Sequence, residues 1–214
     1  QIEKQKTTGR IYDRLFVRHW DTWKDGRRSH LFVMSTAGGK AVEVMEGMDA
    51  DVPSKPFGGP AEIAFTPDGK SVVFAARAVG REEAWSTTFN LYLAPVDGSR
   101  KPQCLTTGNR ATHTHPTFSP DGKVLAYLAM SRPGYEADRF RIILRPWGAA
   151  GRTTRRPTSS PACQERCLAA DWDRSAETIV WSRDGKTIFT TAQDIGQRSL
   201  FAISAATDKV RTLV

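Results

Sequence analysis

A twelve-residue pattern that occurs three times constrains the fold of this chain more than any other feature. It reads TPDGKSVVFAAR at 66–77, SPDGKVLAYLAM at 119–130 and SRDGKTIFTTAQ at 182–193. The Asp-Gly pair in each copy predicts a tight turn, because glycine tolerates positive φ and aspartate can hydrogen-bond to its own backbone. The largely apolar run that follows predicts a strand, so each copy is interpreted as a β-hairpin.

The spacing of the three copies predicts the architecture. Asp68 and Asp121 are 53 residues apart, and Asp121 and Asp184 are 63 apart. Repeats of roughly 40–50 residues with about four strands each are typical of β-propeller blades. The first two runs are apolar on both faces, which predicts strands that are covered on both sides. Further strands are expected at 30–34, 90–96, 140–146 and 199–204, followed by outer strands at 41–45, 103–106 and 210–214.

The sequence therefore predicts an all-β fold, an incomplete β-propeller of about four blades with four antiparallel strands each. We expect one propeller segment over 1–214, with blade parts at roughly 11–48, 61–107, 115–158 and 177–214. The stretch 146–170 (PWGAAGRTTRRPTSSPACQERCLAA) has little to bury. It is expected to be an irregular insertion or crossover.

Composition excludes several classes of partner. The net charge is +8, but no run of Lys and Arg exceeds two residues, so we expect no nucleic-acid partner. No apolar run approaches 18 residues, so no membrane partner is expected. No signal peptide is visible at Gln1, which is uninformative if the start has been processed. Cys104 is interpreted as a small buried residue. Cys163 and Cys167 are compatible with either a disulfide or free thiols.

Binding is expected on one face of the predicted disc. The loops between second and third strands (78–89, 131–139 and 194–198) should share a face with the blade-to-blade crossovers, while the short Asp-Gly turns occupy the opposite face. Chemical variety is concentrated in the long loops, so binding is expected there. The aromatic residues Phe16, Trp20 and Trp23 are interpreted as blade packing, with a binding rim as the alternative.

The sequence contains no motif that predicts a reaction catalysed by this chain itself. Hydrolysis by a serine nucleophile needs a strand-to-helix elbow, usually GxSxG, and neither this motif nor an alternating βα pattern occurs. His113 and His115 have the alternation of zinc ligands on a strand, but no third ligand is identifiable. We expect no catalytic residue, no metal and no cofactor.

Several long stretches resemble the propeller of the prolyl oligopeptidase family, in particular bacterial dipeptidyl-peptidase 5 and acylaminoacyl-peptidase-like enzymes. The most specific are YDRLFVRHWDTWKDGRRSHLFV at 12–33 and LAYLAMSRPGYEADRFRI at 125–142. The resemblance implies a propeller of seven or eight blades that filters peptide substrates ahead of an α/β-hydrolase domain, which is absent from this chain. NRATHTHP at 109–116 and the stretch 146–170 depart from the family pattern.

The resemblance also implies candidate site residues. Glu82 and Glu83 are similar to the propeller glutamates that bind a substrate ammonium group in dipeptidyl peptidases, and Trp85 could offer a ring face. The alternative is a solvated acidic loop beside Arg81. Arg132 and Tyr135 form a second substrate-binding candidate, with structural ion pairing between blades as the alternative.

The expected function is that of a non-catalytic, substrate-gating propeller segment of a serine exopeptidase. The alternative is a Tol-associated-type propeller that acts as a protein-interaction module. The family branch suggests a periplasmic or secreted location, with the cytoplasm as the alternative. Because an unclosed propeller leaves strand edges and apolar faces uncovered, we also expect self-association of the isolated chain.

Overall fold

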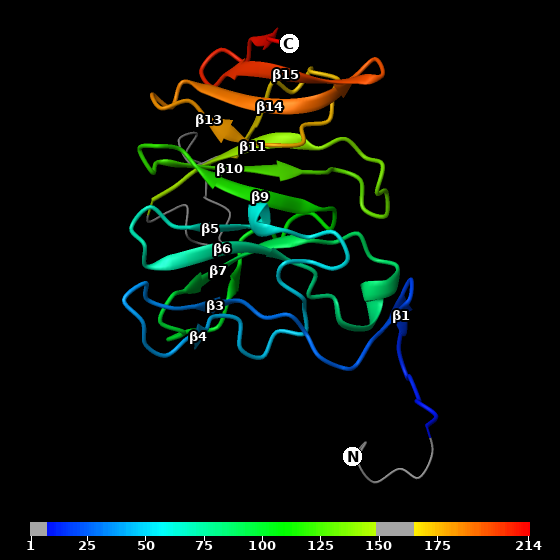
Figure 1. Ribbon diagram of the computed structural model, residues 1–214. Coiled ribbons are helices and arrows are strands. Elements are labelled where there is room, and N and C mark those ends of the chain that lie inside the picture. The colour runs from blue at the N-terminus through cyan, green and yellow to red at the C-terminus, as the bar shows by residue number, and fades with distance from the viewer. Residues whose placement is uncertain (1–7, 149–164) are drawn as a thin grey trace.

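The computed structural model of the chain describes residues 8–148 and 165–214, and it confirms the predicted β-propeller fold (Figure 1). The strands of this part form three four-stranded and two two-stranded antiparallel sheets. Figure 1 shows the blades lying one above another in chain order, with the first at the bottom and the last at the top. The described strands do not close into a ring.

The first two sheets are short. The N-terminal hairpin consists of β1 (Arg18–His19) and β2 (Thr22–Trp23), and the first blade of β3 (Phe32–Val33) and β4 (Val42–Glu43). Figure 1 shows β1 to one side of the stacked blades, so the hairpin is not part of a blade. Within the described residues the first blade has two strands, and they lie at the positions predicted for it, 30–34 and 41–45.

The next three sheets are complete blades. The second blade consists of β5 (Ile63–Phe65), β6 (Ser71–Ala76), β7 (Asn90–Pro95) and β8 (Gln103–Cys104). The third has β9 (His113–Phe118), β10 (Val124–Ala129), β11 (Arg141–Pro146) and β12 (Arg166–Leu168). The fourth has β13 (Val180–Trp181), β14 (Thr187–Asp194), β15 (Gln197–Ser204) and β16 (Val210–Thr212). Two 3₁₀ helices, η2 (Pro60–Glu62) and η3 (Gly80–Ala84), lie in the connections.

The three Asp-Gly turns have one hydrogen-bonding pattern. In the third blade the Ser119 hydroxyl donates to the Asp121 carboxylate at 2.6 Å and accepts from the Val124 N–H at 3.0 Å. Thr66 and Ser182 make the equivalent bonds in the neighbouring blades. Gly122 has φ +69°, and a Cβ there would lie 2.7 Å from Pro67, so neighbouring turns also pack closely.

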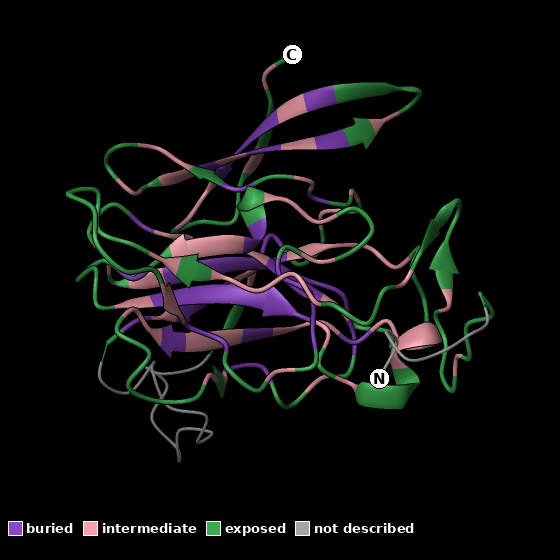
Figure 2. Ribbon diagram, turned by 60° about the horizontal axis from the view of Figure 1, so that its bottom comes forward, coloured by how far each residue is buried: buried purple, intermediate pink, exposed green. Residues whose placement is uncertain are grey.

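The core consists of layers between successive blades. On β6, Phe74 packs toward the first blade, whereas Val73 packs toward Leu125 and Tyr127 of the third. On β10, Leu128 faces the other way, toward Ile188 and Ile203 of the fourth blade. Side chains alternate between the two faces of a strand, so β6 and β10 each bury one set of apolar side chains against the preceding blade and the other set against the next blade, as predicted. Figure 2 shows the buried residues on the central strands of the stack.

The stretch expected to be an irregular crossover contains a strand at its C-terminal end. Within 146–170, Arg166–Leu168 forms β12, which pairs with β11 in the register Ile143↔Cys167 and completes the third blade. Residues 149–164, including Cys163, lie outside the described residues. Cys104 and Cys167 are half-buried and have free thiols.

The two histidines proposed as possible zinc ligands are in the innermost strand of the third blade. The His113 ring nitrogen Nδ1 lies 2.9 Å from the Phe89 carbonyl oxygen, and burial lowers the pKa of His113. His115 has φ +55° at an irregularity of the β9–β10 register. No cluster of three metal-ligating side chains occurs in the residues that the structure describes. In the same residues, no helix has the length and hydropathy of a membrane span.

Candidate functional site on the loop face

The two long loops that carry the candidate residues lie together. The loop from β6 to β7 contains η3, and the loop from β10 to β11 approaches it where the Gly134 N–H donates to the Thr87 hydroxyl at 2.8 Å. The crossover between β4 and β5 reaches the same region, because Asp49, Asp51 and Glu83 all bind one arginine. The predicted sharing of one face by long loops and crossovers therefore holds for these segments.

Glu83 is bound inside a network of polar contacts. Its carboxylate accepts two hydrogen bonds from the guanidinium of Arg28, at 2.9 Å and 2.7 Å, and it pairs with Lys24 at 3.5 Å. Only 16 % of the Glu83 side chain and 12 % of the Arg28 side chain are exposed. The two oxygens of Glu83 are therefore held by Arg28 in a bidentate pair with little exposure to solvent.

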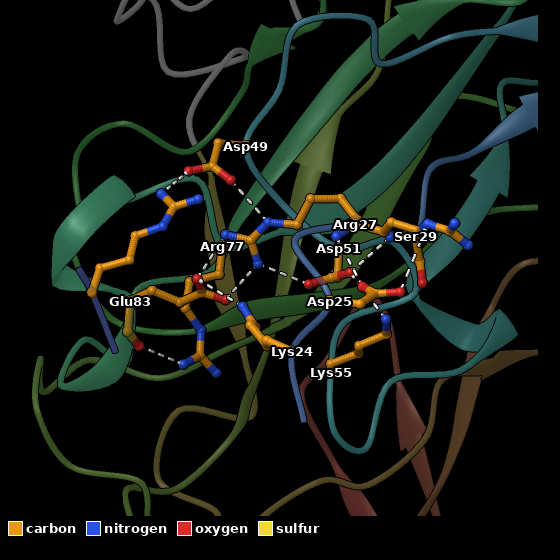
Figure 3. A network of polar contacts seen from close by, with 11 residues as sticks. Lys24, Asp25, Arg27, Ser29, Asp49, Asp51, Lys55, Arg77 and Glu83 are labelled. Atoms are coloured by element: carbon orange, nitrogen blue, oxygen red, sulfur yellow. Dashed lines mark hydrogen bonds and ion pairs between the residues drawn. The ribbon is translucent and has the colours of Figure 1, made fainter. Parts of the chain in front are cut away.

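Arg28 joins three segments that are distant in the sequence. Besides Glu83 in η3, it binds Asp49 and Asp51, each at 2.8 Å, in the crossover after β4. Asp51 also accepts the Ser29 N–H at 2.7 Å. Figure 3 shows the carboxylates of Asp49, Asp51 and Glu83 converging from their separate segments on this network, with Lys24 and Lys55 at its edge.

The electrostatics of the network favour the charged forms. Burial opposes ionisation of Asp49, Asp51 and Glu83, but their hydrogen bonds and the nearby positive charges together outweigh it and hold the pKa of each carboxyl below its ordinary value. Arg28 contributes to all three. For Asp51 the Ser29 N–H contributes more than Arg28 does. The pKa of Arg28 is raised above its ordinary value, chiefly by the hydrogen bonds to Glu83.

Glu82 has a different environment from its neighbour. Its side chain is 54 % exposed and pairs with Arg110 at 2.8 Å, where the arginine side chain is 72 % exposed. Trp85 follows at the end of η3 and is 68 % exposed. The structure therefore separates the two glutamates: Glu82 and Trp85 are accessible on the loop face, while Glu83 points into the network.

Arg132 and Tyr135 form a pair of their own. The guanidinium carbon of Arg132 lies 3.9 Å from the centroid of the Tyr135 ring, and the tyrosine is 53 % exposed. The backbone N–H of Arg132 donates to Asp138, which closes the loop. Arg132 itself makes no ion pair to another blade in the described residues. A cation–π contact is present instead.

Two arginines in this region were not singled out from the sequence. Arg28 is one, and Arg77 is the other. Arg77 donates to the Glu83 carbonyl oxygen at 3.0 Å and lies 4.5 Å from the Phe89 ring centroid. Burial lowers the pKa of Arg77. Arg28 has no local signal, because its partners lie 21 to 55 residues away.

The aromatic residues of the N-terminal region do not pack in a blade, so that prediction is corrected. Trp20 and Trp23 are 71 % and 55 % exposed in the β1–β2 hairpin, and Phe16 is 37 % exposed. The ring of Trp20 lies 6.0 Å from that of Phe57, which is itself exposed. These side chains belong to no core layer, because residues 11–29 extend beside the blades instead of forming inner strands.

Comparison with known proteins identifies relatives over most of the chain. No family model matches it. Dipeptidyl-peptidase 5 of Arthroderma otae is 35 % identical over 219 aligned residues, which cover 94 % of this chain. The chain is a homologue of part of dipeptidyl-peptidase 5. It spans only 28 % of that relative, and the probable dipeptidyl-peptidase 5 of Trichophyton verrucosum matches at 34 % identity with the same share.

Solved structures agree on the fold. A puromycin-hydrolyzing peptidase of Mycobacterium tuberculosis superposes with a TM-score of 0.61 and 14 % identity, over 90 % of this chain and 28 % of that one. A putative TolB from Agrobacterium tumefaciens has a TM-score of 0.59 and 19 % identity, over 87 % of this chain and 55 % of that one. These structures support the fold alone, and the sequence match to dipeptidyl-peptidase 5 confirms the predicted resemblance for the propeller part.

Proposed function

We propose that this chain is the substrate-gating propeller part of a serine exopeptidase that removes dipeptides from peptide amino termini. The observation that carries the proposal is the 35 % identity to dipeptidyl-peptidase 5 over 94 % of the chain. Because this sequence has no GxSxG motif, bond cleavage belongs to an α/β-hydrolase domain in the remainder of the protein. The chain's own part is to admit and orient the peptide.

The loop face offers the chemistry for this role. Glu82 has an accessible carboxylate whose partner, Arg110, is a solvent-exposed and therefore weakly bound group. A peptide ammonium can replace that partner with a charge-assisted hydrogen bond. Trp85 and Tyr135 add exposed ring faces on the two adjacent loops. Glu83, held by Arg28, keeps η3 attached to the blades.

The alternative function, a Tol-associated-type interaction module, has less support. The likeness to the putative TolB is a likeness of fold at 19 % identity, whereas the likeness to dipeptidyl-peptidase 5 extends to the sequence. The acylaminoacyl-peptidase likeness stays a prediction. A periplasmic or secreted location belongs to the proposal, with the cytoplasm as the alternative, and cell fractionation of the source organism decides between them.

Steady-state kinetics on fluorogenic dipeptide amides tests the proposal. The protein that contains this chain should release the fluorophore, and the chain alone should not. Trp85→Ala and Glu82→Gln should raise KM with little change in kcat, since binding of the amino-terminal end is lost and the reacting groups are untouched. Phe65→Ala is the matched control. Like Trp85, Phe65 is exposed, at 58 %, but it lies next to the Asp-Gly turn at 66–70, away from the long loops.

Two results would contradict the proposal. Turnover by the isolated chain that a serine-directed inhibitor abolishes would show that the catalytic residues are in this chain. If the full-length protein released no dipeptide from peptide amino termini, the proposed exopeptidase activity would be wrong.

A further inference from the structure

The N-terminal arm, residues 10–27, is attached to the blades with little apolar burial. No residue of the arm is buried, and none belongs to the core layers between blades. Its large apolar side chains are exposed, including Ile11 at 93 % and Leu15 at 52 %. Its ring contacts to the rest of the chain are those of His19 and Trp20 with the exposed Phe57. The hydrophobic effect, which stabilises the blades, therefore contributes little to holding this arm.

Polar contacts hold the arm instead. Arg14 pairs with Asp49 at 2.8 Å, Lys24 pairs with Glu83 at 3.5 Å, and Arg81 of η3 donates to the Asp13 carbonyl oxygen at 2.7 Å. Two of these contacts use carboxylates that Arg28 also binds, at the base of the arm. The arm, η3 and the crossover after β4 therefore depend on one shared set of charges.

Arg28 is the group that keeps this set in place. Its guanidinium is largely withdrawn from solvent and holds Asp49, Asp51 and both oxygens of Glu83. The arm's side of its ion pairs is more exposed than Arg28, with Arg14 at 48 % and Lys24 at 31 %, and the Lys24–Glu83 pair is long at 3.5 Å. Exposed pairs are weak and are screened by salt, whereas breaking a buried pair by removing one partner is costly. Loss of Arg28 removes the group that fixes the carboxylates of Asp49 and Glu83, to which Arg14 and Lys24 of the arm are paired.

We propose that the N-terminal arm is a strap fastened by Arg28, which detaches together with the η3 loop as one unit while the blades stay folded. Detachment moves Glu82 and Trp85, because both lie on η3 or at its end. Attachment or detachment of the strap therefore changes the positions of Glu82 and Trp85 on the loop face. The inference does not depend on the peptidase function, since it concerns the attachment of two segments of this chain.

Hydrogen exchange measured by mass spectrometry on the full chain tests the strap. In Arg28→Met, exchange in residues 10–27 and 79–86 should become about tenfold faster or more, because a buried ionic partner is lost. Peptides covering β6 and β10 should accelerate by a much smaller factor than the arm and η3, because the blades stay folded when the arm detaches. Arg27→Met is the matched control, because Arg27 is next in sequence but has an 89 % exposed side chain, and among the described residues its ion pair is the long one with Asp25, at 3.7 Å.

Salt provides a second measurement that needs no variant. In the unaltered chain, 1 M NaCl should accelerate exchange in the arm and in η3 before any change in β6 or β10. Unchanged exchange of the arm in Arg28→Met would overturn the proposal. So would acceleration spread evenly over arm and blades, because Arg28 would then stabilise the whole fold. If Arg28→Met does not fold, the salt series alone decides between these outcomes.

Discussion

The two adjacent glutamates of η3 allow a direct test of the environments that the structure assigns to them. Glu83→Gln removes the charge that faces Arg28, in a pair whose side chains are 16 % and 12 % exposed. Breaking a buried pair costs about 3–5 kcal/mol. Arg28 retains Asp49 and Asp51, so we expect a loss of about 2 kcal/mol in the free energy of unfolding. Glu82→Gln breaks a pair that is 54 % and 72 % exposed and should cost at most about 1 kcal/mol.

Thermal unfolding followed by circular dichroism measures this difference. For a chain of this size each kcal/mol lowers Tm by about 2–4 °C, so Glu83→Gln should lower Tm by about 4–8 °C. Glu82→Gln should lower it by no more than about 4 °C, and by less where the pair contributes nothing. Equal Tm values for the two variants, or a larger loss for Glu82→Gln, would refute the assignment of Glu83 to the interior of the network.

Three other predictions concern pH, packing and assembly. The carboxylates bound to Arg28 have depressed pKa values, so their contribution is complete above about pH 4.5 and is lost as pH falls through the lower folded-state values. Tm between pH 5 and 3 should therefore fall more steeply for the unaltered chain than for Arg28→Met. Phe74→Ala should cost about 3–5 kcal/mol in urea unfolding, because Phe74 is fully buried and stacks on Tyr92, whereas Phe65→Ala at an exposed position should cost at most about 0.5 kcal/mol. The isolated chain should self-associate through its uncovered end blades, and a monomer by light scattering with a high Tm would contradict this.

The blades could be predicted because their signals are local. Each Asp-Gly turn carries its own hydrogen-bonding residues, as Ser119 and Asp121 show, and the strand that follows has the apolar pattern of a covered strand. The three-residue strand β12 was not predicted. Its neighbours in sequence are rich in arginine and proline, and pairing with β11 decides its conformation.

The candidate site could be predicted only in part. The sequence indicated the loop that carries Glu82, Glu83 and Trp85, but not that the two glutamates differ. That difference depends on Arg28, which is 55 residues away from Glu83 in the chain. The N-terminal arm has the aromatic and β-branched residues of a strand, yet no neighbouring blade covers it, so composition alone suggested packing that does not occur.

Photo-crosslinking tests the central claim that the loop face meets the peptide. A dipeptide amide with a photoreactive side chain is bound to the protein that contains this chain, irradiated, and mapped by mass spectrometry. The account predicts crosslinks in residues 78–89 and 131–139. Crosslinks in the Asp-Gly turns at 66–70, 119–123 or 182–186, with none in the long loops, would contradict it.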